Sequence, residues 1–331
     1  MKVPGISLLV FLACTASISA LSTLPSGTLV VSKSPSPGQY ESIMKAVKAL
    51  STTSTAKQTI YIKKGEYKEQ VVIPLLRSPL SIYGETSTPL TYKGNTVNIK
   101  HSAGQSDGFN NDQTGTLRVL TPNFSLYNVN VYNQKGKGTQ AVALSAQKEN
   151  QGYYGVSIIG YQDTLLAQKG AQFYAKSYIE GAVDFMFGDA RAVFYDCDIG
   201  VSAGGGYVLA NGRNTSDLTS LFLVDKCRIH AAEKHSVEEK TVYLGRPWGT
   251  HSTALVQRTD LGKIINPKGW SEWSKTDQHT DNAILAELDN TGEGASGERA
   301  SFAKKLRSYV PFETVLGPSY RDWVDSAYVA S

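Results

Sequence analysis

The chain has 331 residues, of which 41% are hydrophobic and 19% are charged. A globular chain of this length buries about 75% of the surface that it exposes when unfolded, and this composition excludes intrinsic disorder. The formal net charge is +4, and basic residues alternate with acidic ones instead of forming a stripe, so we expect no nucleic-acid partner. The 30 glycines, the 18 tyrosines and recurring short runs of Val, Ile and Thr favour strands and turns over a helical bundle.

Residues 1–20 have the layout of a secretory signal, with Lys2 ahead of an apolar core and small residues up to Ala20. The apolar core is too short to span a membrane, and no second apolar run follows. We therefore predict a secreted protein that has no membrane anchor once the signal is removed. Its mature chain, residues 21–331, is predicted to form a single domain. Asn123 and Asn214 begin sequons that a eukaryotic host can glycosylate.

Residues 40–50 predict a short amphipathic helix near the start of the mature chain. Ile43, Val47 and Leu50 follow an i, i+4, i+7 pattern, which places them on one helical face. We expect this helix to cap the structure that follows it.

A strand-like pattern returns at short intervals between residues 120 and 262. The steps are 27, 21, 20, 30 and 32 residues when the following positions are taken as equivalent: Val129, Val156, Ser177, Cys197, Cys227 and Thr259. Steps of this size indicate stacked units that bury their apolar faces only against their neighbours. No helical segment lies between the strands, and the Leu and Asn spacing of leucine-rich repeats is absent. We therefore predict an all-β fold, a parallel β-helix.

Two cysteines, Cys197 and Cys227, remain after the signal is removed with Cys14. This number excludes a disulfide framework and a zinc site built from sulfur ligands. The two residues are either bridged or a pair of buried thiols, and the sequence leaves both alternatives open.

After the repeat, residues 301–309 and 320–328 predict a short helical tail. A Gly-rich stretch, residues 290–297, separates the tail from the strands. No Pro-rich linker or run of charge marks a second unit, which agrees with a single domain.

Two aspartates are candidates for chemistry because both lie in apolar or amide-rich surroundings. Asp163 lies in the segment 161–165, and Asp184 lies in the apolar segment 183–188. A carboxylate among apolar side chains is costly unless a cation pairs with it, and Arg246 is the candidate partner of Asp184. The chain has no GxSxG, HExxH or P-loop motif, and its five histidines lie in unrelated contexts. A serine-hydrolase triad therefore has little support.

Gln140, Gln162 and Asp184 recur at intervals of 22 residues, and this spacing predicts that they stack in one row. Two amide donors and a carboxylate within reach of each other suit acyl transfer, in which a nucleophile attacks a carbonyl and N–H groups hold the developing oxyanion. The same spacing also fits a polar ladder that satisfies stacked amides. The spacing alone leaves both interpretations open.

Five segments resemble, in order, the signature blocks of the pectin methylesterase (pectinesterase) family: Gly65-Glu66-Tyr67-Lys68-Glu69, Gln140-Ala141-Val142-Ala143-Leu144, Tyr161-Gln162-Asp163-Thr164-Leu165, Asp184-Phe185-Met186-Phe187-Gly188 and Leu244-Gly245-Arg246-Pro247-Trp248. The resemblance extends from about Thr28 to Trp323 and so covers nearly all of the mature chain. It implies a right-handed parallel β-helix that removes methyl groups from the galacturonate esters of pectin. It also implies that methanol is released without a metal or cofactor.

The resemblance further implies a role for each matching residue. Asp184 is expected to be the nucleophile, oriented by Arg246. Asp163 is expected to be a protonated acid that donates its proton to the leaving methoxide and later activates water. Gln140 and Gln162 are expected to donate to the oxyanion. These roles require surroundings that hold the pKa values of the two carboxyl groups apart.

Two structural expectations follow from the same blocks. Gln162 and Asp163 are adjacent and would point to opposite faces of an ideal strand, so the strand must end or bend there. Four aromatic residues are expected to contact the substrate, because they lie in or near the blocks in which the family has substrate contacts: Trp248, Phe187, Tyr161 and Trp270. For Trp270, as for Trp273, core packing near the end of the solenoid fits equally well.

Other functions are compatible with the fold and the polymer. A polygalacturonase or a pectate lyase would share both, but the clustered Asp-Asp and Asn-Thr-Asp motifs of the first and the calcium-binding acidic cluster of the second do not occur. A non-catalytic β-helix that binds wall polysaccharide disagrees with the presence of both aspartates, Arg246 and both glutamines. We expect a monomer whose partner is pectin.

Overall fold

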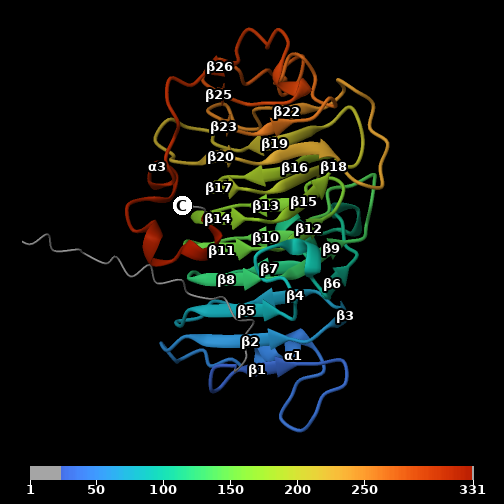
Figure 1. Ribbon diagram of the computed structural model, residues 1–331, viewed down its shortest axis with the longest axis vertical. Coiled ribbons are helices and arrows are strands. Elements are labelled where there is room, and N and C mark those ends of the chain that lie inside the picture. The colour runs from blue at the N-terminus through green and yellow to red at the C-terminus, as the bar shows by residue number, and fades with distance from the viewer. Residues whose placement is uncertain (1–23, 330–331) are drawn as a thin grey trace, which may run out of the picture.

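The computed structural model describes residues 24–329, so the predicted signal at residues 1–20 lies outside the described part of the chain. The strands form three parallel sheets, A, B and C, that run along the length of the molecule (Figure 1). In successive coils the chain passes from sheet A to sheet B and then to sheet C. This arrangement confirms the predicted parallel β-helix.

The elements have the following bounds. Sheet A contains β1 (Leu29–Val31), β2 (Gln58–Ile62), β5 (Leu80–Gly84), β8 (Phe124–Tyr127), β11 (Gln151–Tyr154), β14 (Ala171–Ala175), β17 (Arg191–Tyr195), β20 (Leu221–Asp225), β23 (Thr253–Gln257), β25 (Ile284–Leu288) and β26 (Lys304–Lys305). Sheet B contains β3 (Gly65–Lys68), β6 (Val97–His101), β9 (Val129–Asn133), β12 (Ser157–Ile159), β15 (Tyr178–Gly181), β18 (Asp198–Val201), β21 (Arg228–Ala231) and β24 (Asp260–Leu261). Sheet C contains β4 (Val71–Ile73), β7 (Leu117–Val119), β10 (Leu144–Ala146), β13 (Leu165–Ala167), β16 (Val183–Gly188), β19 (Tyr207–Asn211) and β22 (Tyr243–Gly245). The helices are α1 (Ile43–Lys48), α2 (Asn111–Thr114) and α3 (Phe312–Leu316), with 3-10 turns at η1 (Tyr92–Gly94), η2 (Gln105–Asp107), η3 (Glu293–Ala295), η4 (Tyr320–Asp322) and η5 (Ser326–Tyr328).

A single residue with left-handed backbone forms the corner between sheets A and B in successive coils. These corner residues are Asn128 (φ 53°), Gly155 (φ 57°), Lys176 (φ 50°), Asp196 (φ 51°), Lys226 (φ 53°) and Arg258 (φ 50°). Each corner immediately precedes one of the positions that the sequence predicted to be equivalent. The strand register confirms that equivalence, because the aligned residues one step further on are Asn130, Ser157, Tyr178, Asp198, Arg228 and Asp260.

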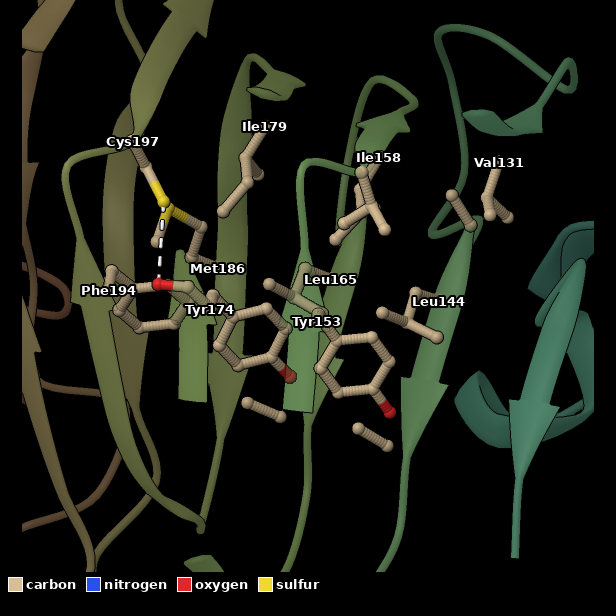
Figure 2. Packing of buried hydrophobic residues seen from close by; sticks show 14 of the residues in the cluster. Val131, Leu144, Tyr153, Ile158, Leu165, Tyr174, Ile179, Met186, Phe194 and Cys197 are labelled. Atoms are coloured by element: carbon tan, nitrogen blue, oxygen red, sulfur yellow. Dashed lines mark hydrogen bonds between the residues drawn. The ribbon is translucent and has the colours of Figure 1, made fainter. Parts of the chain in front are cut away.

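Aligned side chains from successive coils fill the interior (Figure 2). From sheet A, the ring of Tyr174 stacks on those of Tyr153 and Phe194, with centroids 4.8 Å apart in both pairs. From sheet C, a buried aliphatic row faces these rings and consists of Leu144, Leu165 and Met186. Each coil thus buries its apolar side chains against the coils beside it, as the repeat predicted.

The predicted N-terminal helix is confirmed but is shorter than expected, because α1 begins at Ile43 and ends at Lys48. Its predicted apolar face is buried. The carboxylate of Glu69 accepts hydrogen bonds from the backbone N–H groups of Ile43 and Met44, both at 2.9 Å. These bonds satisfy donors that the first turn of a helix leaves free. The helix packs on β1 and β4 and so caps the first coil.

The C-terminal tail differs from the prediction. Residues 301–309 are not helical but contain β26, which pairs with β25 as the last strand of sheet A. An open sheet edge offers backbone partners, whereas an isolated short helix is marginal in water. The segment 320–328 forms only the two 3-10 turns η4 and η5. The tail lies along the outer side of sheet A (Figure 1), where the ring of Phe312 packs edge-on against those of Phe173 and Tyr195.

Cys197 and Cys227 are free, buried thiols, which decides between the two alternatives that the sequence left open. The backbone N–H of Cys197 donates to Sγ of Cys227 at 3.4 Å. Asn123 and Asn214 are both exposed, and their glycosylation stays a prediction. Between residues 24 and 329, no helix is both long and apolar enough to cross a membrane.

Candidate active site

A cavity of about 260 Å³ lies on the outer face of sheet C. Phe187 and Ala210 form part of its floor, and they alternate with the interior residues Met186 and Leu209. The complete lining is Asn111, Gln140, Gln162, Asp163, Asp184, Phe187, Ala210, Arg246, Trp248 and Trp273. The cavity therefore brings together all five residues that were expected to carry chemistry.

Both aspartates have a left-handed backbone, with φ of 61° for Asp163 and 48° for Asp184. Asp163 lies just before β13, and this conformation is the bend that was predicted after Gln162. Asp184 lies where the register between β16 and β19 shifts, between Val183 and Met186. Left-handed backbone is strained for non-glycine residues, and here, as at the corners between sheets A and B, the surrounding coils hold it in place.

The predicted row of Gln140, Gln162 and Asp184 is wrong in its register. Leu144 pairs with Leu165, and Leu165 pairs with Met186, so one coil spans 21 residues here rather than 22. By this register Asp163 and Asp184 are the equivalent pair, and Gln162 bridges to Val183 instead. The glutamines and Asp184 still reach one cavity because the backbone bends at both aspartates.

Arg246 holds Asp184 through two parallel hydrogen bonds. Its Nε donates to Oδ1 of Asp184 at 2.9 Å, and its Nη2 donates to Oδ2 at 2.6 Å. The guanidinium lies 4.0 Å from the ring centroid of Tyr207 and 4.2 Å from that of Trp273. Burial disfavours the charged guanidinium, but the hydrogen bonds and the charge of Asp184 outweigh burial and raise the pKa of Arg246. A two-pronged pair of this kind fixes the carboxylate in one orientation.

Asp163 has a very different environment from that of Asp184. Burial, followed by the negative charge of Asp184, raises the pKa of Asp163 from 3.8 to about 8. A hydrogen bond from Asn111 and the charge of Arg246 oppose this rise. At neutral pH Asp163 is therefore mostly a neutral acid, next to a carboxylate that is paired with arginine.

Asn111 is a cavity residue that the sequence did not reveal. It lies on α2, and its Nδ2 donates to Oδ2 of Asp163 at 3.3 Å. The two residues are 52 positions apart in the chain, and no spacing signal connects them. Ala210 was also missed, and only the alignment of β16 with β19 places its small side chain beside Phe187.

The structure separates the four predicted aromatics into two groups. Phe187 and Trp248 line the cavity with ring centroids 5.9 Å apart, and Trp248 is 37% exposed. Trp270 is only 1% exposed, and its Nε1 donates to Oε1 of Glu287 at 3.1 Å. This burial favours core packing for Trp270, and the prediction that Trp270 contacts the substrate is wrong. Tyr161 is partly buried and is not part of the cavity lining.

Chemically, the cavity offers an oriented carboxylate, a neutral carboxyl, two side-chain amides and an apolar floor. Between residues 24 and 329, no group of three or more His, Cys, Asp or Glu is arranged to hold a metal ion. The residues present suit acyl transfer by a carboxylate nucleophile with a neighbouring acid.

Asp163→Asn is expected to stabilise the fold at pH 8 and to lose this advantage near pH 4. Asp163 has an ordinary pKa of 3.8 and a folded-state pKa of about 8. Between these values the folded state binds more protons than the unfolded state, so the free energy of unfolding of the wild type falls as pH rises. Asparagine does not ionise and avoids this loss. Melting temperatures of both proteins at pH 4, 6 and 8 test this, and an equal difference at all three values would contradict the raised pKa.

Comparisons with known proteins give a consistent assignment. The family model described as Pectinesterase matches residues 28–308. The chain is 44% identical to a pectinesterase of Aspergillus niger over 97% of each chain, and 43% identical to one of Aspergillus aculeatus over 96% of each. Among solved structures, the deglycosylated pectin methylesterase of Aspergillus niger aligns with a TM-score of 0.86 at 38% identity, covering 92% of this chain and 99% of that one. Pectin methylesterase from carrot aligns with a TM-score of 0.81 at 28% identity, covering 91% and 97%.

Proposed function

The chain belongs to the pectinesterase family, and from this premise we propose that Asp184 is the nucleophile and Asp163 the acid and base of its reaction. The protein is a pectin methylesterase, a carboxylic ester hydrolase that acts on the methyl esters of pectin. One observation carries the proposed roles. An arginine-held carboxylate and a buried carboxyl with a pKa of about 8 line the same cavity.

In the first half of the reaction, a carboxylate oxygen of Asp184 attacks the carbonyl carbon of the methyl ester. The side-chain amides of Gln140 and Gln162 donate hydrogen bonds to the oxyanion that forms, a contribution worth about 10²–10³ in rate per donor at other acyl-transfer sites. The intermediate collapses, the bond to the methoxy oxygen breaks, and the proton of Asp163 passes to that oxygen. Methanol leaves, and an anhydride joins Asp184 to the galacturonate.

In the second half, Asp163 is ionised and takes a proton from water. The hydroxide attacks the galacturonate carbonyl carbon, and Asp184 leaves as a carboxylate. The proton taken from water leaves Asp163 in its neutral form, ready for the next ester. Arg246 keeps Asp184 aimed throughout, and the two carboxyl groups exchange no roles because their environments differ.

Trp248→Ala is expected to raise KM for esterified pectin by about tenfold with a smaller change in kcat. Trp248 is the exposed ring of the cavity, and loss of one aromatic packing surface costs about 1–1.5 kcal/mol of binding. Tyr309→Ala is the matched control, because Tyr309 is similarly exposed but is not part of the cavity lining. An unchanged KM in Trp248→Ala would exclude the ring from substrate contact.

Three further properties belong to the same proposal. Residues 21–331 act as one catalytic domain, which is supported by sheets that continue from β1 to β26. The protein is secreted after removal of residues 1–20, which rests on the sequence pattern alone. It acts on pectin as a monomer.

Methanol release measured beside the viscosity of esterified pectin tests the proposed function. An esterase releases methanol and leaves the viscosity at fixed ionic strength nearly constant, whereas a depolymerase thins the solution. A non-catalytic binding protein does neither. Thinning without methanol, or no methanol at all, would contradict the proposal.

A further inference from the structure

A chain of two side-chain hydrogen bonds leads into the cavity and ends on Asp163. Nε2 of Gln105 donates to Oδ1 of Asn111 at 2.8 Å, and Nδ2 of Asn111 donates to Oδ2 of Asp163 at 3.3 Å. Neither Gln105 nor Asn111 belongs to the signature blocks. These two hydrogen bonds therefore add Gln105 and Asn111 to the residues that surround Asp163, the proposed acid.

Asn111 is carried by a helix that is fixed on both sides of it. Asn110 caps the first turn of α2 in a reciprocal pair with Gln113. Asp112 pairs with Arg118 and accepts a hydrogen bond from Oγ of Ser145 at 2.7 Å. A polar side chain on so firmly anchored an element keeps its direction better than one on a free loop.

The end of α2 is anchored as well. Oγ1 of Thr114 accepts a hydrogen bond from the backbone N–H of Val142 at 3.0 Å. Gln105 is also held in place, because its backbone N–H donates to the carbonyl oxygen of Gln140 at 3.0 Å. The segment that carries Gln105 is thus tied to one of the two proposed oxyanion donors.

The direction of these hydrogen bonds bears on which oxygen of Asp163 carries the proton. An oxygen that accepts the N–H of Asn111 does not direct its own proton along the same line. Acceptance of this N–H by Oδ2 therefore favours Oδ1 as the site of the proton in neutral Asp163, and Oδ2 stays the acceptor when Asp163 ionises. If the Asn111 amide were turned around, its oxygen would face Asp163 and would hold the proton on Oδ2, between the two side chains.

We propose that Gln105 and Asn111 are positioning residues that keep the acid proton of Asp163 on Oδ1, where it is free to reach the leaving methoxide. The proposal rests on the function proposed for Asp163. Gln105 acts by fixing the orientation of the Asn111 amide, and Asn111 acts by occupying Oδ2. Neither residue takes part in bond making.

Gln105→Glu tests the proposal because it reverses the hydrogen-bond chain with little change in shape. Glutamate only accepts, so it turns the Asn111 amide, and the proton moves to Oδ2. We expect kcat to fall about 10–100-fold with KM within about twofold of wild type. We also expect the alkaline limb of the kcat–pH profile to move up by about 0.5–1 pH unit, because Asp163 loses a donor to its charged form.

Two control variants separate polarity from shape and charge. Gln105→Met keeps the length and removes the polarity, so the Asn111 amide loses its fixed orientation without being reversed, and kcat should fall by only about threefold. Ser106→Glu places the same charge on the next, exposed residue and should leave kcat near wild type. Asn111→Ala should lower kcat by about tenfold and raise the alkaline limb, since Asp163 loses its donor.

The proposal is overturned if Gln105→Glu and Gln105→Met have the same kcat and the same alkaline limb. It is also overturned if Ser106→Glu lowers kcat as far as Gln105→Glu does, because charge alone would then explain the effect. Failure of the proposed function has a different signature. In that case Asp163→Asn itself would keep a kcat near that of the wild type, whatever the Gln105 variants do.

Discussion

Asp184→Asn is expected to lower kcat for methanol release by at least about 10³-fold while the protein remains folded. The amide has nearly the size of the carboxylate, so the packing at the bend before Phe185 is preserved. It lacks the negative charge that attacks the ester carbon, and it leaves the two donors of Arg246 with one acceptor oxygen instead of two. Methanol release at saturating esterified pectin, together with a melting curve, measures both parts of the expectation.

Asp196→Asn is the matched control for this change. Asp196 has the same left-handed backbone, with φ of 51°, but it forms a corner between sheets A and B and pairs with Lys176 at the surface. Its substitution should leave methanol release within about twofold of wild type. A purified Asp184→Asn enzyme that works within tenfold of the wild-type rate would show that another group is the nucleophile.

Arg246→Lys is expected to lower kcat by about 10²-fold although the positive charge is kept. The ammonium of lysine cannot reproduce two parallel hydrogen bonds to Oδ1 and Oδ2 of Asp184, nor can it stack in the same way between Tyr207 and Trp273. A misaimed carboxylate loses the geometry of attack, so the effect should appear mainly in kcat. Arg246→Ala should be slower still and should melt lower, because removing one partner of a buried pair typically costs about 3–5 kcal/mol.

Arg258→Lys is the control that separates an effect on the orientation of Asp184 from an effect on the stability of the fold. Arg258 also holds a buried carboxylate through two bonds, to Asp225 at 2.9 and 2.6 Å, and it stacks on Tyr309. This pair is not part of the cavity lining. Arg258→Lys should therefore lower the melting temperature and leave kcat unchanged. A wild-type kcat in Arg246→Lys, or a wild-type melting temperature in Arg246→Ala, would contradict the proposed role of Arg246.

The coil pattern could be predicted from the sequence because each coil repeats the same local arrangement of corner residue and interior side chain. The positions from Val129 to Thr259 are apolar or small, face the interior and directly follow a left-handed corner, so their spacing carries the register. The tail could not be predicted in this way. Residues 301–309 have no strong strand pattern, and they form β26 only because sheet A ends with an open edge there.

The site was predictable only in part. The five chemical residues were singled out by their surroundings and spacing, and the family blocks supplied their expected roles. The row deduced from 22-residue spacing was off in register because the local coil spans 21 residues. Burial and the bends at Asp163 and Asp184 depend on tertiary structure, which spacing does not encode. Asn111 illustrates the limit, because a four-residue helix brings it to Asp163 across 52 positions of sequence.

A covalent intermediate on Asp184 is the most direct test of the proposed mechanism. The wild-type enzyme is mixed with a methyl-esterified galacturonate oligomer, quenched with acid during the first turnover and mapped by peptide mass spectrometry. We predict a galacturonate adduct on Asp184, formed together with an equal amount of methanol and absent from Asp184→Asn. An adduct on Asp163 or on any other residue, or a full turnover of methanol from Asp184→Asn, would contradict the mechanism.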